Sequence, residues 1–218
     1  MTGRCIIIGA GPVEQGDLAA AALTGQDFII AADAGYLTCK RLGIAPNLIM
    51  GDFDSAPMPQ AEVPVLTHPA EKDDTDSMLA VKHGLGLGYS EFVLLGGLGG
   101  RLDHTLANIQ TLHYIARAGG RGTLYGGDTT LTTVREGSLT LRRSPHIVSV
   151  FALDGPCYGV TERGLYYLLE EATVTGSFPI GVSNLFAEET ATISVREGTL
   201  LVALIRDEEQ GRAAIGGR

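Results

Sequence analysis

Acidic residues gather in one short stretch whose residue types could bind a metal ion. Residues 46–55 read Pro-Asn-Leu-Ile-Met-Gly-Asp-Phe-Asp-Ser, so Asp52 and Asp54 closely follow the apolar run Leu48–Met50. Such a run predicts a buried strand, and ligands of an open α/β sheet gather at the carboxyl ends of its strands. Two carboxylates there repel each other unless a cation lies between them, and oxygen ligands suit Mg²⁺, which commonly arrives with substrate phosphates. Taken alone, the stretch is equally compatible with a polar turn shaped by its aspartates.

A second acidic stretch follows the strand expected at residues 63–66. Asp73, Asp74 and Asp76 fall within four residues. Lys72 precedes them, and a short apolar helical pattern follows. One acid is enough to cap a helix and to meet its dipole, so three exceed that requirement. We therefore expect this stretch to be functional, with Asp73 or Asp74 also capping the helix.

Glycines dominate a third stretch. After the strand expected at residues 91–95, residues 96–104 read Gly-Gly-Leu-Gly-Gly-Arg-Leu-Asp-His. Glycine lets backbone N–H groups approach a ligand closely, and a helix N-terminus attracts anions. Arg101 carries a planar fork of donors that suits phosphate oxygens, and Asp103 can cap the helix that follows. The stretch predicts an anion cradle, with a connector without function as the alternative.

The elements that must position these residues alternate between strands and helices in the first half of the chain. Further strands are expected near residues 4–8 and 28–32, the second followed directly by Asp33, whose simplest role is a helix cap. The helix after the glycine stretch is expected to bury one apolar face, made of Leu102, Leu106, Ile109, Leu112, Ile115 and Ala116. The turn after the first strand resembles the opening of a nucleotide-binding unit, but Glu14 stands where the third glycine of a dinucleotide fingerprint belongs. The pattern predicts a Rossmann-like three-layer α/β domain.

From about Thr123 short alternating runs replace the helical patterns, which is typical of an antiparallel β sandwich or barrel. These runs are expected at residues 130–134, 138–142, 147–153, 172–175, 191–195 and 199–205. Residues 134–139 (Val-Arg-Glu-Gly-Ser-Leu) are echoed by residues 195–200 (Val-Arg-Glu-Gly-Thr-Leu), and each glycine is expected to form a tight hairpin turn. The boundary between the two parts is placed near Gly126 and Gly127, with a frayed tail at the C-terminus.

Composition excludes several classes of protein. The 218 residues are 44% hydrophobic, which allows a substantial core in one large or two small domains. A net charge of −9 without a basic stripe argues against a nucleic-acid partner, and an acidic protein that handles phosphates needs a metal. No apolar run approaches the ~20 residues of a membrane span, and the start lacks a signal-peptide pattern, so a cytoplasmic protein is expected. The three cysteines form neither a disulfide framework nor a metal-ligand spacing, and Cys5 and Cys157 are expected in the core.

Together these segments resemble the thiamine pyrophosphokinase family. The matching segments of the first half are residues 32–35, 46–55, 72–76 and 96–104. In the second half, residues 164–169 and 181–184 resemble the thiamine-side segments of the family. The likeness covers nearly the whole chain in order, and the acidic and glycine motifs in combination are specific.

The resemblance implies an enzyme that transfers the β,γ-pyrophosphoryl group of ATP to the hydroxyethyl group of thiamine, giving thiamine diphosphate and AMP. Residues 1–126 would form the ATP-binding catalytic domain, residues 127–210 a β-sandwich domain for thiamine binding and dimerisation, and residues 211–218 a flexible tail. Mg²⁺ is the expected cofactor and ATP the co-substrate. The resemblance also implies a homodimer with active sites between subunits, thiamine lying near the β domain of one chain and ATP on the α/β domain of the other.

Specific residues follow from the motifs and the resemblance together. The expected metal ligands are Asp52, Asp54 and Asp76. The expected catalytic residues are Asp54, Asp76, Arg101 and Asp103, with Asp103 orienting Arg101 or a substrate group. ATP or its phosphates would contact Asp33, Lys72, Asp73, Thr75, Gly97, Gly99, Gly100 and Arg101. Ser183 and Asn184 would contact the aminopyrimidine ring of thiamine.

Three alternatives stay open at the level of sequence. A related pyrophosphokinase acting on a hydroxymethylpterin could carry similar acidic and glycine motifs. An oxidoreductase could use the first glycine turn for a dinucleotide, although Glu14 interrupts the fingerprint. A non-catalytic module would bind a nucleotide or thiamine without turnover.

Overall fold

The chain forms two compact units, Met1–Gly127 and Asp128–Arg218. The structure, a computed structural model, describes residues 3–53, 62–68 and 73–207. Asp54, Lys72 and the expected tail at residues 211–218 lie outside the described residues. Each unit encloses its own cluster of buried apolar side chains, so each is described by itself.

The first unit alternates strands and helices, as its sequence pattern predicts. Its elements are β1 (Cys5–Ile8), α1 (Gln15–Ala21), β2 (Phe28–Ala32), α2 (Gly35–Leu42), β3 (Leu48–Gly51), β4 (Val65–Thr67), α3 (Asp76–Gly86), β5 (Glu91–Leu95), α4 (Leu102–Arg117) and β6 (Arg121–Gly126). The expected strands near residues 28–32 and 91–95 are confirmed, whereas β6 was not expected from the sequence. Gly43 ends α2 in a left-handed conformation, with φ of 68°.

The strands of this unit pair in parallel in the order β6-β5-β1-β2-β3-β4. The central strand β1 is completely buried, because a parallel sheet is covered on both faces. Its continuous apolar run Cys5–Ile8 therefore reads as a buried strand without alternation. The carboxyl ends of all these strands lie along one edge of the sheet, which is where the polar residues of the sequence motifs follow.

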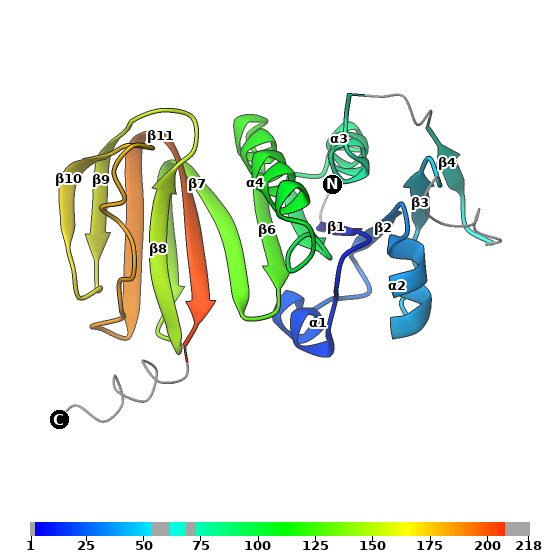
Figure 1. Cartoon of the computed structure of the whole chain (residues 1–218), viewed down its shortest axis with the longest axis horizontal. Coiled ribbons are helices and arrows are strands. Elements are labelled where there is room, and N and C mark those ends of the chain that lie inside the picture. Colours follow the sequence, from blue (N-terminus) through cyan, green and yellow to red (C-terminus); the bar gives the residue numbers. More distant parts are fainter. Residues whose placement is uncertain (1–2, 54–61, 69–72, 208–218) are drawn as a thin grey trace. The chain divides into compact units, whose positions relative to one another are not determined.

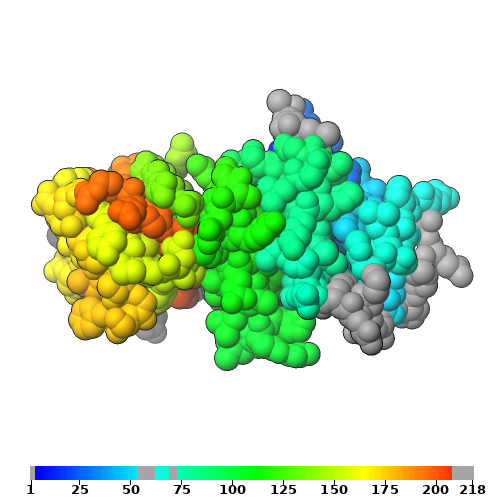
Figure 2. All heavy atoms as spheres, turned by 90° about the horizontal axis from the view of Figure 1, so that it is seen from above, coloured from blue at the N-terminus to red at the C-terminus, as the bar shows by residue number. Residues whose placement is uncertain are grey.

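Helices cover both faces of the parallel sheet (Figure 1). The chain moves from β1 through α1 and α2 to β3 in one direction across the sheet, and from β4 through α3 and α4 to β6 in the other. Right-handed crossovers therefore place α1 and α2 on one face and α3 and α4 on the opposite face. Figure 2 shows α3 and α4, in teal and green, side by side over their face.

Two helical details differ from the expectations. Thr75, not Asp73 or Asp74, caps α3, because its hydroxyl oxygen accepts a hydrogen bond from the Met78 N–H at 3.2 Å. In α4 the buried face comprises Asn108, Thr111, Leu112, Ile115 and Ala116. Leu102 and Leu106, expected inside, are 73% and 54% exposed. The predicted buried face is therefore confirmed for the second half of α4 only.

The second unit is built from antiparallel strands. They are β7 (Thr129–Arg142), β8 (His146–Ala152), β9 (Cys157–Arg163), β10 (Leu169–Val174) and β11 (Thr190–Arg206). β11 pairs with β7 along most of its length, and its other edge pairs first with β9 and then with β8. β10 completes the sheet beside β9. The expected antiparallel pairing is confirmed, although β9 was not expected.

The echoed Val-Arg-Glu-Gly segments do not form hairpin turns, so that expectation was wrong. Both lie inside long strands, where Val134 pairs with Leu200 and Val195 with Gly137. The pairing register shifts between Val195 and Thr199, where residues 196–198 of β11 lie opposite the single residue Glu136 of β7, so the extra residues form a bulge in β11. The positive φ falls on Glu136 (43°) in β7 but on Gly198 (102°) in β11.

None of the helices in the described part of the chain combines the length and apolar character needed to span a bilayer. Cys5 and Cys157 are fully buried in the core, as expected, and Cys39 is 1% exposed. Burial raises the pKa of Cys5 to about 12 and that of Cys39 to about 11. These thiols are therefore packing residues and not nucleophiles at neutral pH.

Candidate metal and phosphate site

Three aspartates converge at the carboxyl edge of the parallel sheet. Asp33 follows β2, Asp52 follows β3, and Asp76 is the first residue of α3. One carboxylate oxygen from each lies within 4.8 Å of the other two, and all three residues are half-buried. Residues separated by up to 43 positions thus share one small volume because β2 and β3 are neighbours in the sheet and α3 packs against both.

The backbone around Asp33 explains how the carboxylates meet. The Asp33 N–H donates a hydrogen bond to the Met50 carbonyl at 2.7 Å, which extends the β2–β3 pairing by one step. Asp33 then adopts a left-handed conformation, with φ of 48°, which aspartate tolerates better than most residues. This turns the chain from β2 into α2 and leaves the Asp33 side chain beside the end of β3.

The donor set of this cluster consists of carboxylate oxygens, which suits a hard divalent cation such as Mg²⁺. Three like charges at this spacing repel one another in the absence of a cation. Two members, Asp52 and Asp76, belong to the metal set expected from the sequence, and Asp33, expected as a phosphate-side residue, joins them. The third expected ligand, Asp54, lies outside the described residues.

Two glycine turns pack against each other beside the acidic cluster. The Gly9 N–H donates to the Leu95 carbonyl at 2.8 Å, and the Gly11 N–H donates to the Gly96 carbonyl at 3.0 Å. A Cβ atom at residue 11 would lie 2.4 Å from the Gly96 oxygen, so only glycine fits there. The turn after β1 and the turn after β5 therefore form one glycine-rich wall.

Asn108 of α4 supports this wall. Its side chain is buried, and its Nδ2 group donates a hydrogen bond to the Gly97 carbonyl at 3.1 Å. Since Gly97 is in the turn between β5 and α4, the bond links the glycine turn to the helix that it precedes. A Cβ on Gly97 would lie 2.9 Å from the same Nδ2 atom.

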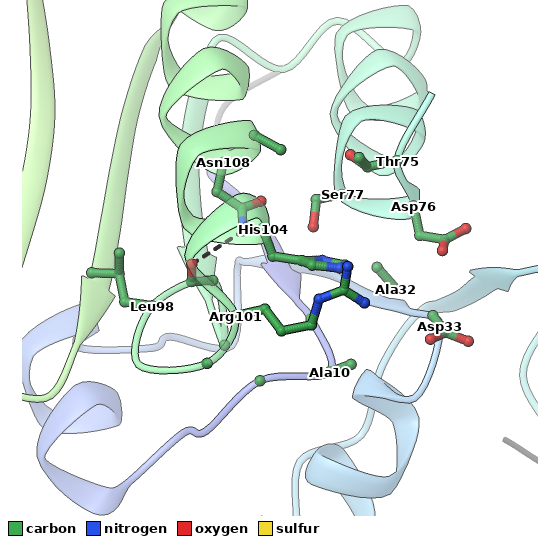
Figure 3. Close-up of a pocket in the computed structure, with 16 residues that line it drawn as sticks. Ala10, Ala32, Asp33, Thr75, Asp76, Ser77, Leu98, Arg101, His104 and Asn108 are labelled. Atoms are coloured by element: carbon green, nitrogen blue, oxygen red, sulfur yellow. Dashed lines mark hydrogen bonds between the residues drawn. The ribbon is translucent and has the colours of Figure 1, made fainter. Parts of the chain in front are cut away.

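A cavity of about 340 Å³ lies between the glycine wall and the aspartates. Its lining comes from residues 9–11, 32–33, 75–77, 96–98, 100–101, 104 and 107–108. Figure 3 shows the Arg101 and His104 side chains reaching into the cavity, with Asp33 and Asp76 on its opposite side. Cationic and N–H donors on one side and carboxylates on the other suit a phosphate chain that carries a metal ion.

Arg101 and Asp103 form a fully exposed pair at the entrance to α4. The Arg101 Nη2 and Nε groups donate to the two Asp103 carboxylate oxygens at 2.5 and 3.1 Å. Hydrogen bonding from Arg101 lowers the pKa of the Asp103 carboxyl, which also accepts the His104 N–H. Through these two hydrogen bonds Asp103 orients the guanidinium plane of Arg101.

The other described residues of the acidic stretch 72–76 make different contacts. Thr75 lines the cavity and caps α3. Asp74 points to Lys82, whose Nζ lies 2.7 and 2.8 Å from its two oxygens. Asp73 is exposed, and Gly99 does not line the cavity although Gly97 and Gly100 do. The structure therefore brings together Thr75, Asp76, Gly97, Gly100 and Arg101, but not Asp73 and Gly99.

The residues expected to contact thiamine lie in the second unit. Ser183 is exposed and has a left-handed backbone, with φ of 63°. Asn184 is only 4% exposed, and its amide is hydrogen bonded within the unit to Glu162, Tyr167 and Leu185. The two neighbours thus differ sharply in how accessible they are to a ligand.

Several cavity residues were not expected from the sequence. Ser77, His104 and Asn108 line the cavity, as do the glycines of the turn after β1. The first glycine turn was interpreted as a weak dinucleotide fingerprint, and its position after a strand was the signal for an anion site. Asn108 offered a signal as well, since it is a polar residue on the inward side of α4.

Comparisons with known proteins agree with this geometry. The model of the thiamin pyrophosphokinase catalytic domain matches residues 19–121, and the model of the thiamin pyrophosphokinase vitamin B1 binding domain matches residues 138–200. A thiamine pyrophosphokinase of Bacillus subtilis is 26% identical over 181 residues, which cover 79% of this chain and 85% of that protein.

Solved structures show the same similarity. The crystal structure of thiamine pyrophosphokinase from Bacillus subtilis has a TM-score of 0.84 and 25% identity, covering 94% of this chain and 100% of that one. The enzyme from Geobacillus thermodenitrificans gives a TM-score of 0.82 and 26% identity over 96% of this chain and 100% of that one. Yeast thiamin pyrophosphokinase, at 15% identity and a TM-score of 0.73 over 95% of this chain and 87% of its own, shares the fold.

Proposed function

Since this chain belongs to the thiamin pyrophosphokinase family, we propose that it transfers pyrophosphate from ATP to thiamine, giving thiamine diphosphate and AMP. The observation that carries the proposal is that the catalytic and vitamin B1 binding models match in order along one chain. The cavity of the first unit supports it independently, because it combines an oxygen ligand set, an arginine and a glycine wall. The finer fold proposed with this function is a Rossmann-like α/β domain followed by a β sandwich.

In the proposed reaction, the thiamine hydroxyl oxygen forms a bond to the β-phosphorus of ATP. The bond from that phosphorus to the oxygen bridging to the α-phosphate breaks, and AMP leaves with this oxygen. The hydroxyl proton passes to a carboxylate of the site, for which Asp54 and Asp76 are the candidates. Such transfers depend on in-line positioning and on neutralised phosphate oxygens more than on covalent help from the protein.

The chain's own residues are assigned accordingly. Asp33, Asp52 and Asp76 would hold Mg²⁺, with Asp54 retained as a fourth candidate, and the ion would neutralise charge on the phosphates. The Gly96–Gly100 backbone and Arg101 would hold the phosphate oxygens, and Asp103 would keep the Arg101 fork oriented. Lys72, Asp73 and Gly99 remain proposed phosphate-side residues.

We also propose a Mg²⁺-dependent cytoplasmic homodimer that shares its active sites between subunits, as the resemblance implies. Exposed apolar side chains of the second unit, including Tyr166, Tyr167 and Phe178, at 63–69% exposure, support a binding or subunit surface there. Ser183, exposed on the same unit, is the proposed polar contact to thiamine.

A mass spectrum of the products tests the substrate and the transferred group together. The purified chain, incubated with thiamine, ATP and Mg²⁺, should give thiamine diphosphate and AMP in equal amounts. Thiamine monophosphate with ADP, or no product, would overturn the proposal. A parallel incubation with hydroxymethylpterin provides the matched comparison, since AMP release with the pterin alone would favour the related pyrophosphokinase.

A further inference from the structure

Asn184 of the second unit is saturated with hydrogen bonds and cannot offer its amide to a ligand. Its Nδ2 group donates to Glu162 Oε2 at 2.9 Å and to the Tyr167 carbonyl at 2.6 Å. Its Oδ1 atom accepts the N–H groups of Tyr167 and Leu185 at 2.9 and 3.0 Å. An asparagine side chain has two N–H donors and two acceptor lone pairs, so every position is occupied.

The consequence of this bonding is that two separate chain segments are clamped together. The Asn184 amide binds both backbone polar groups of Tyr167, and its own backbone exchanges two hydrogen bonds with Val148 of β8, each at 2.8 Å. The Tyr166 N–H donates to the Leu185 carbonyl at 2.9 Å alongside. Residues 166–168 and 182–185 therefore lie side by side, and both segments expose side chains to solvent.

Glu162 is the residue that holds the amide in this orientation. It is the second-to-last residue of β9 and is 2% exposed. An ionised carboxylate can only accept hydrogen bonds, so it pairs with the Nδ2 end of the Asn184 amide and thereby selects which end faces β9. Rotating the amide by half a turn would place Oδ1 against both the Glu162 carboxylate and the Tyr167 carbonyl.

We propose that Glu162 is a positioning residue for thiamine binding, which acts through Asn184 to hold residues 166–168 beside residues 182–185 in the conformation that receives the vitamin. The inference rests on the proposed function and refines it, because it replaces direct ligand contact by Asn184 with preorganisation of the exposed segments. Preorganised segments bind a ligand more tightly because no conformational entropy is lost in ordering them on binding.

The cost of keeping this carboxyl inside supports a specific role. Burial raises the pKa of Glu162, and the Asn184 hydrogen bond offsets only part of that effect. An apolar residue would suit the surroundings, since the neighbouring core contains Val160, Ile193 and Phe186. A buried acid at this position therefore costs stability that an apolar residue would not.

The test compares three single variants of the full chain. Glu162→Met removes the acceptor at similar length, Glu162→Gln keeps an acceptor for the amide, and Glu170→Gln alters an exposed carboxyl on the adjacent strand as a matched control. The thiamine KM, the ATP KM and kcat are measured from AMP release, thiamine binding is measured by calorimetry, and thermal unfolding checks the fold.

For Glu162→Met we expect the thiamine KM and Kd to rise about tenfold, as for a lost hydrogen bond to a charged group, with the ATP KM within about twofold of wild type. Glu162→Gln should recover most of the affinity, and Glu170→Gln should match wild type. If the methionine variant does not fold, Glu162→Val, which suits a strand, replaces it.

Two results would overturn the inference while leaving the proposed function standing. The first is a folded variant without the acceptor that keeps the wild-type thiamine KM and Kd. The second is an equal rise in both KM values, which indicates a general structural role. If the wild type itself neither binds nor converts thiamine, the proposed function fails, and this inference fails with it.

Discussion

Asp33, Asp52 and Asp76 are close enough together for their negative charges to repel one another strongly. Unit charges about 5 Å apart repel by about 3 kcal/mol at an effective dielectric constant of 20. Such a cluster opposes folding without a cation and favours it with one, because a bound ion that prefers the folded state stabilises that state. The carboxylates are therefore better explained by ligand binding than by stability.

Asp76→Asn should lower kcat by about 100-fold, in line with losing one electrostatic contact to transferring phosphate groups. Its thermal stability without Mg²⁺ should equal or exceed that of wild type, because one of three like charges is removed. AMP release at saturating thiamine, ATP and Mg²⁺ measures the first effect, and thermal unfolding measures the second.

Asp74→Asn is the matched control, since Asp74 is two residues away but points to Lys82. It should keep a rate close to that of wild type. Equal rates for the two variants at saturating Mg²⁺ would contradict the assignment of Asp76 as a metal ligand.

At the scale of elements, turns and bulges decide where the functional side chains lie. The turns after β1 and β5 approach each other through Gly11 and Gly96, which brings the glycine wall to the aspartates. In the second unit, a bulge at residues 196–198 of β11 interrupts the regular pairing of two long strands. The two echoed segments face each other at this bulge, but their glycines are under different backbone constraints.

Gly198→Ala should destabilise the chain by about 1–3 kcal/mol, as expected for overpacking. The residue has φ of 102°, and an added Cβ would lie 2.9 Å from Cys157 Sγ and 3.3 Å from the Pro156 oxygen. Urea unfolding monitored by circular dichroism gives the free energy difference.

Gly137→Ala is the matched control in the echoed segment. Its nearest contact would be the Arg135 oxygen at 3.4 Å, and its φ is not positive. We expect a change within about 1 kcal/mol, of either sign. A similar loss of unfolding free energy in the two variants would show that the positive φ of Gly198 is not the reason this position requires glycine.

At the scale of the whole molecule, each unit carries part of the proposed function and encloses its own core. The described residues that line the cavity all belong to the first unit, whereas the vitamin B1 binding model matches only residues of the second. A homodimer that shares its sites, as the resemblance implies, would combine the first unit of one chain with the second unit of the other.

This arrangement predicts complementation between inactive variants. Asp76→Asn affects the first unit, and Ser183→Trp fills an exposed position of the second. After subunit exchange, half of the dimers are mixed and one of their two sites is intact, so about one quarter of the wild-type activity should return. AMP release from the mixture, with sedimentation velocity to establish the dimer, measures the effect.

Mixing Asp76→Asn with Asp33→Asn provides the control. Both substitutions affect the first unit, so no mixed dimer contains an intact cavity and activity should stay low. If the protein sediments as a monomer, or if the mixture of Asp76→Asn with Ser183→Trp stays inactive, the active sites are not shared between subunits.

The sequence alone was sufficient for features that depend on neighbours along the chain. The apolar runs at residues 28–32 and 91–95 predicted strands because burial on both faces leaves no alternation. The family resemblance rested on the acidic and glycine motifs, which are likewise continuous in sequence, and the family models confirmed it.

Only the tertiary structure decided which distant residues meet. Asp33 joins Asp52 and Asp76 because β2 and β3 pair in parallel, and strand order cannot be read from local pattern. Asn184 turns inward because the fold brings Glu162 and Tyr167 next to it, and the echoed segments meet at a bulge because β7 and β11 pair with each other. Local sequence encodes backbone preference and burial, whereas hydrogen-bond partners are chosen by the elements that pack against a residue after the chain has folded.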